Sequence, residues 1–166
     1  MNALAGQLLQ RSEIAAALAP YRSAGQAIVF TNGCFDLLHI GHVRYLAEAR
    51  SHGNVLVVGL NSDASVRGLK GPRRPLVPQA ERAEMLAHLA SVDYVTIFDE
   101  PTADALIEVV RPAIYVNGGD IVSSRVPELA TVERHGVRLV IASLVEERST
   151  TEIIARVLAA YDSRAS

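Results

Sequence analysis

Short apolar segments alternate with amphipathic segments along most of this chain. Five segments rich in β-branched and aliphatic residues predict strands, at residues 27–30, 55–60, 94–98, 114–116 and 137–141. Most of these segments lack a strict alternation of apolar and polar positions, which is typical of parallel strands buried on both faces. The pattern therefore predicts a parallel sheet.

Apolar residues at helical spacing fill the stretches between the predicted strands. The predicted helices are residues 12–18, 41–52, 81–90, 102–110, 127–135 and 149–161. This alternation predicts an α/β fold, a single Rossmann-like domain in which a five-stranded parallel sheet carries helices on both faces. We expect residues 1–25 to form an N-terminal helical lead-in, residues 26–161 the domain and residues 162–166 a tail. Residues 68–79, which include three prolines, are predicted to form a long loop.

The composition narrows the class of protein. The 166 residues suffice for one domain, and 49% hydrophobic with 20% charged residues excludes a mainly disordered chain. A net charge of -2 argues against a nucleic-acid or membrane-surface partner. Cys34 is the only cysteine, which excludes an internal disulfide and a cysteine-cluster metal site. No apolar segment is long enough to span a membrane and no secretory signal is visible, so we expect a soluble cytoplasmic domain.

The segment after the first predicted strand reads TNGCFDLLHIGH, from Thr31 to His42. Its glycines allow the backbone to approach a ligand closely. His39 and His42 lie at the start of a predicted helix, where unpaired N–H groups and the helix dipole favour a phosphate. The alternatives are two surface histidines, or a metal site that Asp36 forms with them. A P-loop, a dinucleotide-binding fingerprint and a hydrolase nucleophile elbow are all absent from the sequence.

Positive charges gather in and beside the predicted loop. Four cations without an acid among them indicate an anionic ligand more than a solvated loop, and they are Arg67, Lys70, Arg73 and Arg74. Lys70 is the only lysine of the chain. Arg82 lies near the start of a predicted helix, where the dipole disfavours a cation, so it too indicates a partner anion.

Two further motifs follow predicted strands near the end of the chain. Asn117, Gly118, Gly119 and Asp120 come after the fourth strand, where a plain turn is the simplest explanation. Ser149 and Glu152 form a capping box at the start of the last predicted helix. Thr150 and Thr151 add two hydroxyls that capping does not need, and the three hydroxyls together are suited to a second phosphate site.

These motifs, together with Asn-Ser-Asp, Leu-Lys-Gly, Arg-Pro and Ser-Thr-Thr in the same order and spacing, resemble the small nucleotidyltransferases with an H-x-G-H motif. The resemblance covers about residues 27–154, and is greatest to the adenylyltransferases of heptose 1-phosphate. It implies that AMP passes from ATP to a sugar 1-phosphate, D-glycero-D-manno-heptose 1-phosphate, by direct in-line attack, giving an ADP-sugar and pyrophosphate. Residues 26–161 would then be the nucleotidyltransferase domain. ATP, a sugar phosphate and a second copy in a homodimer are the implied partners.

The resemblance also implies a role for each matching residue. His39, His42 and Lys70 would be catalytic, because they would stabilise charge on the reacting phosphates. Nucleotide contacts are implied for Thr31, Asn32, Gly33, Cys34, Phe35, His39, His42, Arg82, Asn117, Gly118, Gly119, Asp120, Ser149, Thr150 and Thr151. Acceptor contacts are implied for Asp36, Asp63, Lys70 and Arg73. We expect Mg²⁺ to enter with ATP and the protein to supply no dedicated metal ligand.

Two residues depart from the pattern of the heptose enzymes. Asn117 stands where those enzymes often have lysine, and Cys34 where valine or threonine is expected. Three alternatives therefore remain open. The chain could be a cytidylyltransferase acting on glycerol 3-phosphate or a similar small alcohol phosphate, a regulatory module that binds a nucleotide without turnover, or a divalent-metal protein.

Overall fold

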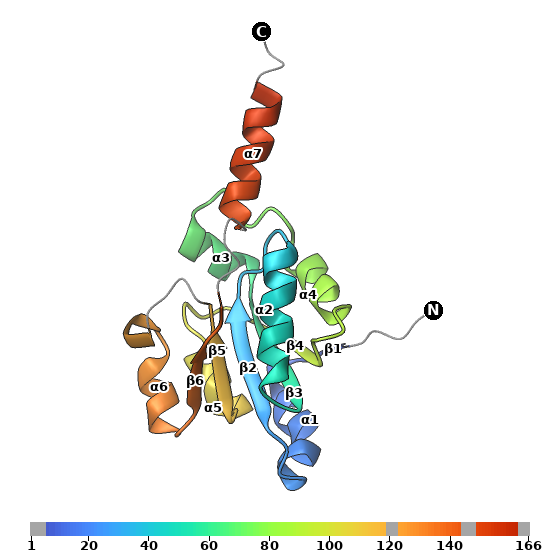
Figure 1. Cartoon of the computed structure of the whole chain (residues 1–166), viewed down its shortest axis with the longest axis vertical. Helices are drawn as coiled ribbons and strands as arrows, with labels where there is room; N and C mark the ends of the chain where they lie inside the picture. Colours follow the sequence, from blue (N-terminus) through green and yellow to red (C-terminus); the bar gives the residue numbers. More distant parts are fainter. Residues whose placement is uncertain (1–5, 119–122, 144–148, 163–166) are drawn as a thin grey trace.

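A parallel sheet with the strand order β1-β4-β3-β2-β5-β6 runs through the middle of the molecule (Figure 1). The computed structural model describes residues 6–118, 123–143 and 149–162. The strands are β1 (Gln7–Leu8), β2 (Ile28–Gly33), β3 (Val55–Asn61), β4 (Tyr94–Phe98), β5 (Ile114–Asn117) and β6 (Arg138–Ile141), and every neighbouring pair is parallel. The predicted α/β fold is confirmed.

The sheet has six strands among the described residues, where the sequence pattern predicted five. The additional strand is β1, which pairs with β4 at the edge of the sheet. Both of its residues are exposed, so no alternation of buried and exposed positions marks it as a strand. Backbone pairing with Tyr94 and Val95 defines it instead.

Helices cover both faces of the sheet, as predicted. They are α1 (Arg11–Ser23), α2 (Ile40–Ser51), α3 (Asp63–Lys70), α4 (Gln79–Ala87), α5 (Asp104–Val110), α6 (Leu129–Arg134) and α7 (Thr150–Asp162), with a short 3₁₀ turn η1 (Ser123–Arg125). Side chains of α1, α5 and α6 pack with one set of sheet residues, whereas those of α2 and α4 pack with the other set. The molecule is therefore a three-layer sandwich with the sheet in the middle.

The central strand β3 is buried along its whole length. Val55 and Val57 belong to the core on the α1 and α5 side, and Leu56 and Val58 to the core on the α2 and α4 side. Each such side chain contributes about 1.5–3 kcal/mol when it is fully buried. This two-sided burial explains why the strand reads as a continuous apolar run.

One helix of the structure, α3, was not predicted. Ser62 caps it by accepting a hydrogen bond from the Ser65 amide, and only Ser65 and Val66 among its residues are buried. The prediction of a loop over 68–79 was therefore wrong at its start, because this helix has eight residues and only two large apolar side chains, Val66 and Leu69, to mark it. The irregular segment begins only after Lys70.

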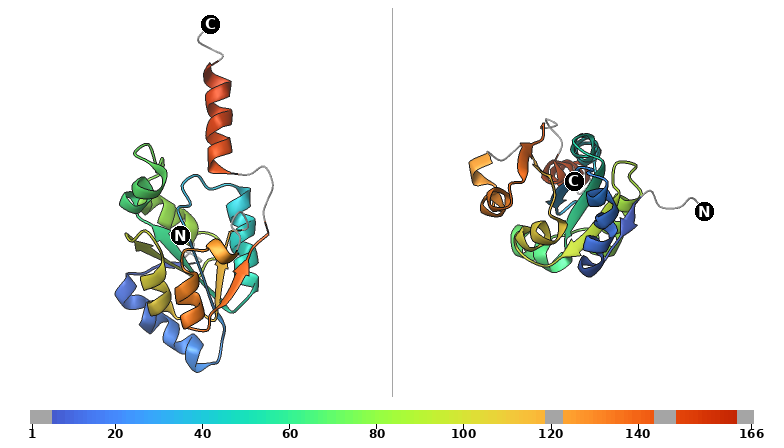
Figure 2. Two further views of the ribbon diagram at one scale, coloured as in Figure 1. Left: turned by 90° about the vertical axis from the view of Figure 1, so that its left-hand side faces the viewer. Right: turned by 90° about the horizontal axis from the view of Figure 1, so that it is seen from below.

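The last helix projects from the rest of the molecule (Figures 1 and 2). Three of its apolar side chains are largely exposed, Val157, Leu158 and Tyr161, at 51%, 57% and 64%. The N-terminal end of α7 faces the rest of the chain, so this helix contributes its first turn rather than its length. No helix of the described ranges is long and apolar enough to cross a membrane.

Candidate active site

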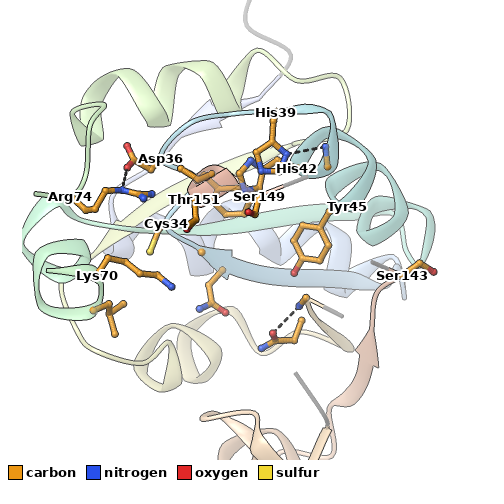
Figure 3. A pocket seen from close by; sticks show the side chains of 18 residues that line it. Cys34, Asp36, His39, His42, Tyr45, Lys70, Arg74, Ser143, Ser149 and Thr151 are labelled. Carbon is orange, nitrogen blue, oxygen red and sulfur yellow. Dashed lines mark hydrogen bonds and ion pairs between the residues drawn. The ribbon is translucent and has the colours of Figure 1, made fainter. Parts of the chain in front are cut away.

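A cavity of about 630 Å³ lies at the carboxyl ends of β2 and β5, between the first turns of α2 and α7 (Figure 3). In open α/β sheets this end is where ligands bind. Thirteen of the residues that the sequence predicted for the site line the cavity, namely Asn32, Gly33, Cys34, Phe35, Asp36, His39, His42, Lys70, Asn117, Gly118, Ser149, Thr150 and Thr151. They come from segments that are more than 100 positions apart in the chain.

The loop from β2 to α2 forms one wall of the cavity. Phe35 adopts a left-handed conformation with φ 44° and buries its ring, which is 5% exposed. A Cβ atom on Gly33 would lie only 3.0 Å from that ring, so Gly33 allows the ring to fold back over the strand end. The loop thereby brings Cys34 and Phe35 to the wall of the cavity.

His39 and His42 stack against each other at the start of α2, with ring centroids 3.9 Å apart. His39 is the N-cap, and its Nδ1 accepts a hydrogen bond from the Gly41 amide at 3.1 Å. The neutral ring of His39 consequently carries its proton on Nε2. Burial, together with the neighbouring His39, lowers the pKa of His42 to about 4, so the His42 ring is neutral at pH 7. At pH 7 His42 can therefore offer an N–H donor without a positive charge.

Asp36 organises a second wall rather than facing a ligand directly. Its side chain is 1% exposed and accepts the amides of Leu76 and Val77 at 2.8 and 2.9 Å, as well as the guanidinium of Arg74. Burial alone would raise the pKa of Asp36, but these two amides and Arg74 hold it below its ordinary value. Both carboxylate oxygens are thus engaged, and the loop after α3 is tied to the loop after β2.

This pairing corrects the interpretation of the four cations as lacking an acid. Arg74 has Asp36 as its partner, although 38 positions separate them in the chain. Arg67 and Arg73 do not line the cavity. Lys70, at the last residue of α3, does line it and is exposed.

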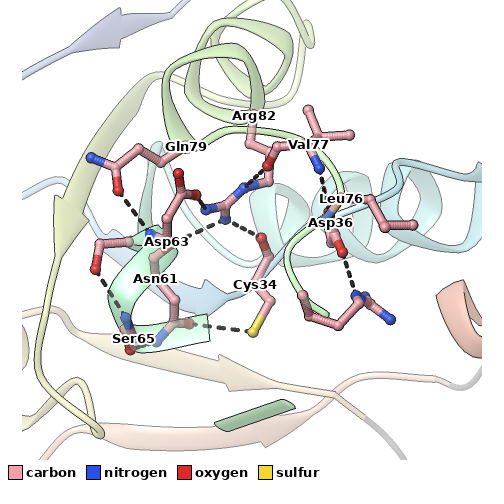
Figure 4. Close-up of polar contacts among 11 residues, drawn as sticks. Cys34, Asp36, Asn61, Asp63, Ser65, Leu76, Val77, Gln79 and Arg82 are labelled. Carbon is pink, nitrogen blue, oxygen red and sulfur yellow. Dashed lines mark hydrogen bonds and ion pairs between the residues drawn. The ribbon is translucent and has the colours of Figure 1, made fainter. Parts of the chain in front are cut away.

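Arg82 is fully buried and lies beside the cavity without lining it (Figure 4). Its guanidinium donates to the carbonyls of Val77, Cys34 and Asn61 at 2.9, 2.5 and 2.9 Å, and to the Asp63 carboxylate at 2.7 Å. The partner anion predicted for Arg82 is thus a side chain of the protein. Direct ligand contacts were predicted for Arg82 and Asp63, but the two residues contact each other, because buried guanidinium donors need acceptors.

Three other predicted site residues lie elsewhere or outside the described ranges. Thr31 is fully buried, and its hydroxyl meets that of Tyr45, which in turn donates to the Val116 carbonyl at 3.0 Å. Thr31 therefore supports the cavity wall from behind instead of reaching a ligand. Gly119 and Asp120 lie outside the described residues.

The N-terminal end of α7 completes the cavity. Ser149, Thr150 and Thr151 all line it, and Ser149 Oγ accepts a hydrogen bond from the Glu152 amide at 3.1 Å. Of the capping box predicted from the Ser149 and Glu152 spacing, the bond to the Ser149 hydroxyl is thus present. The N-terminal ends of α2 and α7 both border the same cavity, and the positive ends of their dipoles suit a ligand with several phosphates.

Five lining residues were not predicted for the site: Gly41, Tyr45, Leu69, Arg74 and Ser143. Tyr45 follows His42 by three positions, so helical spacing could have placed it on the same face. Ser143 follows β6, and the rule that ligands bind at carboxyl strand ends could have identified it. Leu69 has no such signal.

The arrangement suits phosphate chemistry more than metal binding. Burial raises the pKa of the Cys34 thiol, against the opposing charges of Lys70 and Arg82, so Cys34 is a weak nucleophile at pH 7. Within 6–118, 123–143 and 149–162, no three His, Cys, Asp or Glu side chains gather into a potential metal site. The interpretation of Asp36, His39 and His42 as a metal site is therefore not supported.

Comparison with known sequences places this chain in a protein family. A family model described as cytidylyltransferase-like matches residues 30–156. The bifunctional protein HldE of Geobacter metallireducens is 56% identical over 140 residues, which are 84% of this chain and 29% of that protein. HldE of Geobacter sulfurreducens is 53% identical over 148 residues, which are 89% of this chain and 30% of that protein. The chain thus spans about three tenths of the length of these relatives.

Solved structures share the fold. The lipopolysaccharide core biosynthesis protein of Thermoplasma volcanium superposes with a TM-score of 0.65 at 27% identity, covering 74% of this chain and all of that one. Pantothenate synthetase of Thermus thermophilus superposes with a TM-score of 0.60 at 20% identity, covering 92% of this chain and 71% of that one. The second likeness concerns the fold alone.

Proposed function

This chain belongs to the cytidylyltransferase-like family and is a nucleotidyltransferase, and we propose that it transfers AMP from ATP to a sugar 1-phosphate, D-glycero-D-manno-heptose 1-phosphate. The products are an ADP-sugar and pyrophosphate. The observation that carries this proposal is the meeting of the His39–His42 pair, Lys70 and the first turn of α7 at one cavity. In this proposal the reaction takes place in the cytoplasm, in a homodimer whose catalytic unit is residues 26–161.

The proposed reaction is a single in-line displacement. A phosphate oxygen of the sugar phosphate attacks the α-phosphorus of ATP, a new O–P bond forms there, and the bond to the β-phosphate oxygen breaks to release pyrophosphate. The attacking oxygen is already anionic at pH 7, so no general base is needed. Charge moves onto the leaving phosphates, where N–H donors and a cation lower its energy.

Several residues share this stabilisation. His39 and His42 donate N–H groups to the phosphates, and a phosphate beside His42 favours its protonated form. Lys70 neutralises phosphate charge, while the first turn of α7 holds the phosphates by its amides and hydroxyls. Enzymes lower barriers by about 8 kcal/mol or more, and one hydrogen bond to a charged group contributes about 1.5–3 kcal/mol. No single residue can therefore account for the rate enhancement, which depends on all of these groups positioning the phosphates together.

In this proposal magnesium is part of the substrate, MgATP. Among the residues that the structure describes, Asp36 is the one carboxylate that lines the cavity, and both of its oxygens are already engaged by Arg74 and two amides. The ion is therefore held by the nucleotide phosphates, as is common for Mg²⁺. Its contribution when bound is to neutralise charge on those phosphates.

The test is pyrophosphate release from ATP and from CTP, each with heptose 1-phosphate and with glycerol 3-phosphate, in magnesium buffer. We expect turnover only with ATP and the heptose phosphate. Turnover only with CTP and glycerol 3-phosphate would identify a cytidylyltransferase. ATP binding without turnover in all four mixtures would identify a nucleotide-binding regulatory module.

A matched pair of variants on α3 tests the site assignment. Lys70→Ala should lower kcat/KM roughly tenfold to a hundredfold, because it removes a charged contact to phosphate. Arg67→Ala removes an exposed cation from the same helix without altering the cavity lining, so its kcat/KM should stay within about twofold of the unmodified chain. Equal losses in both variants would mean that general attraction of anions, rather than a contact of Lys70, matters.

A further inference from the structure

A buried polar network centres on the hydroxyl of Tyr115. Tyr115 is 0% exposed, and its hydroxyl lies 2.6 Å from Asn32 Oδ1 and 3.0 Å from Glu128 Oε2, and accepts Asn117 Nδ2 at 3.1 Å. Glu128 is 3% exposed and also accepts the Ala103 amide at 3.0 Å. Burial and the nearby Glu128 raise the pKa of Tyr115, so the hydroxyl keeps its proton. Removing this hydroxyl would break three contacts at once.

The network lies where the sheet topology reverses. From β2 the chain continues to β3 on one side, and β5 later pairs with β2 on the other side. In open α/β sheets the crevice at such a switch point binds the nucleotide. The Phe30 and Tyr115 rings are paired in register across β2 and β5 and stack at 5.8 Å. Asn32 and Asn117 follow two positions later, on the same face and nearer the cavity.

The network determines which atoms the two amides can offer to a ligand. Oδ1 of Asn32 is taken by Tyr115, and Oδ1 of Asn117 accepts the Gly118 amide at 2.8 Å. One Nδ2 proton of Asn117 goes to Tyr115, and each side chain keeps at least one further N–H. Both residues line the cavity. This wall therefore presents uncharged N–H donors.

Uncharged donors suit a particular part of a nucleotide. In the proposed function the phosphates bind at the two helix N-termini and Lys70, which carry positive potential. Amide N–H groups suit the hydroxyl, ether and carbonyl oxygens of a ribose or a base. The wall formed by Asn32 and Asn117 is thus matched to the nucleoside part of the ligand.

We propose that Tyr115 is a positioning residue, which holds the side-chain amides of Asn32 and Asn117 in the orientation that binds the nucleoside part of the nucleotide. The proposal rests on the proposed function in one respect, that the ligand is a nucleotide. Tyr115 itself touches no ligand, because it is buried behind the two amides. Its effect should therefore depend on whether the ligand has a nucleoside part.

The test compares ATP with inorganic tripolyphosphate, which lacks that part, by titration calorimetry. Tyr115→Phe should weaken ATP binding about tenfold, the value of one to two lost hydrogen bonds, and leave tripolyphosphate binding unchanged. Tyr94→Phe is the matched control, because it removes a hydroxyl from another strand that does not border the cavity. It should alter neither affinity.

Other results would overturn the proposal. Equal weakening of ATP and tripolyphosphate by Tyr115→Phe would show only a structural role, and unchanged ATP binding would show no role. Asn117→Ala keeps Tyr115 and Glu128 intact and should reproduce the selective loss, so the test stands even if Tyr115→Phe folds poorly. If the unmodified chain binds no nucleotide, both this inference and the proposed function fail. If it binds ATP and neither variant changes the affinity, this inference alone fails.

Discussion

Two buried charged side chains, Arg82 and Asp36, connect the loops around the cavity. Arg82 joins the carbonyls of Cys34 and Asn61 to the Asp63 carboxylate, and Asp36 joins the loop after β2 to the amides after α3. Each therefore acts by holding backbone in place. Replacing either residue should therefore lower the free energy of unfolding, and activity should fall only as a consequence.

Replacing Arg82 should cost far more than replacing an exposed arginine. Arg82→Ala leaves three carbonyls and the Asp63 carboxylate without their donor, so the free energy of unfolding should fall by about 3–5 kcal/mol. Arg134→Ala removes an exposed ion pair with Glu108 and should cost about 1 kcal/mol or less. Urea denaturation of both variants measures the difference, and similar values for the two would contradict the role of Arg82.

His42 should make stability depend on pH. Its pKa in the folded chain is about 4, below the ordinary 6.5, so between these values the unfolded chain binds a proton that the folded chain does not. The free energy of unfolding should therefore be at its full value above pH 6.5 and fall by up to about 3 kcal/mol as the pH falls to 4. His42→Gln should remove this part of the slope, whereas His88→Gln, at an exposed position, should not. Parallel pH profiles for the unmodified chain and His42→Gln would contradict the prediction.

At the level of helices and strands, the space around a glycine Cα determines whether a larger residue could take its place. Gly53 lies between α2 and β3, where a Cβ atom would come within 2.6 Å of Val29 Cγ2 and 2.7 Å of the Ala27 carbonyl. Gly68 lies within α3, where a Cβ atom would meet nothing within 4 Å. The first glycine is needed for close packing of the chain, and the second is not.

The two glycines should respond in opposite directions to alanine. Gly53→Ala should lower the free energy of unfolding by about 1–3 kcal/mol, because backbone atoms must move to admit the methyl group. Gly68→Ala should raise it by up to about 1 kcal/mol, through the better helix propensity of alanine. Thermal unfolding of both variants tests the signs. A stabilised Gly53→Ala variant would mean that the turn before β3 adapts.

For the molecule as a whole, folding and ligand binding draw on different parts of the chain. The buried hydrophobic residues of both cores lie between Ile14 and Ala142. Thr150 and Thr151 of α7 line the cavity together with the preceding Ser149. No described residue of this helix is fully buried. The last helix therefore serves the site more than the core.

Shortening the chain to residues 1–148 should separate these two contributions. The midpoint of thermal unfolding should change little, because none of the removed residues whose burial the structure describes, 149–161, is fully buried. ATP affinity should fall at least about tenfold, because a helix end and three hydroxyls at the phosphates are lost. Alanine at residues 149–151 in the full chain is the matched control and should reproduce most of that loss. A large fall in the unfolding midpoint would show that α7 supports the fold.

The main features of the fold could be predicted from local patterns. Strands such as β3 are apolar throughout because both faces are buried, and helices such as α2 carry their own start signal in His39 and its neighbours. Much of the site could also be predicted from local sequence, since the motif from Thr31 to His42 and the hydroxyls of 149–151 each occupy one short segment. The rule that strand ends meet at one edge then brings them together.

Contacts between distant segments could not be predicted in this way. Tyr115 meets Asn32 across 83 positions, Arg82 meets Cys34 across 48, and Arg74 meets Asp36 across 38. A buried donor takes whichever acceptor the packed chain brings to it, and no local pattern encodes that partner. Composition and local pattern alone thus specified the layers of this protein and the motifs at one edge of its sheet. Packing of the whole chain decided that Lys70 and Arg74 line the cavity, that Arg82 is paired behind it, and which side chains hold the cavity walls in place.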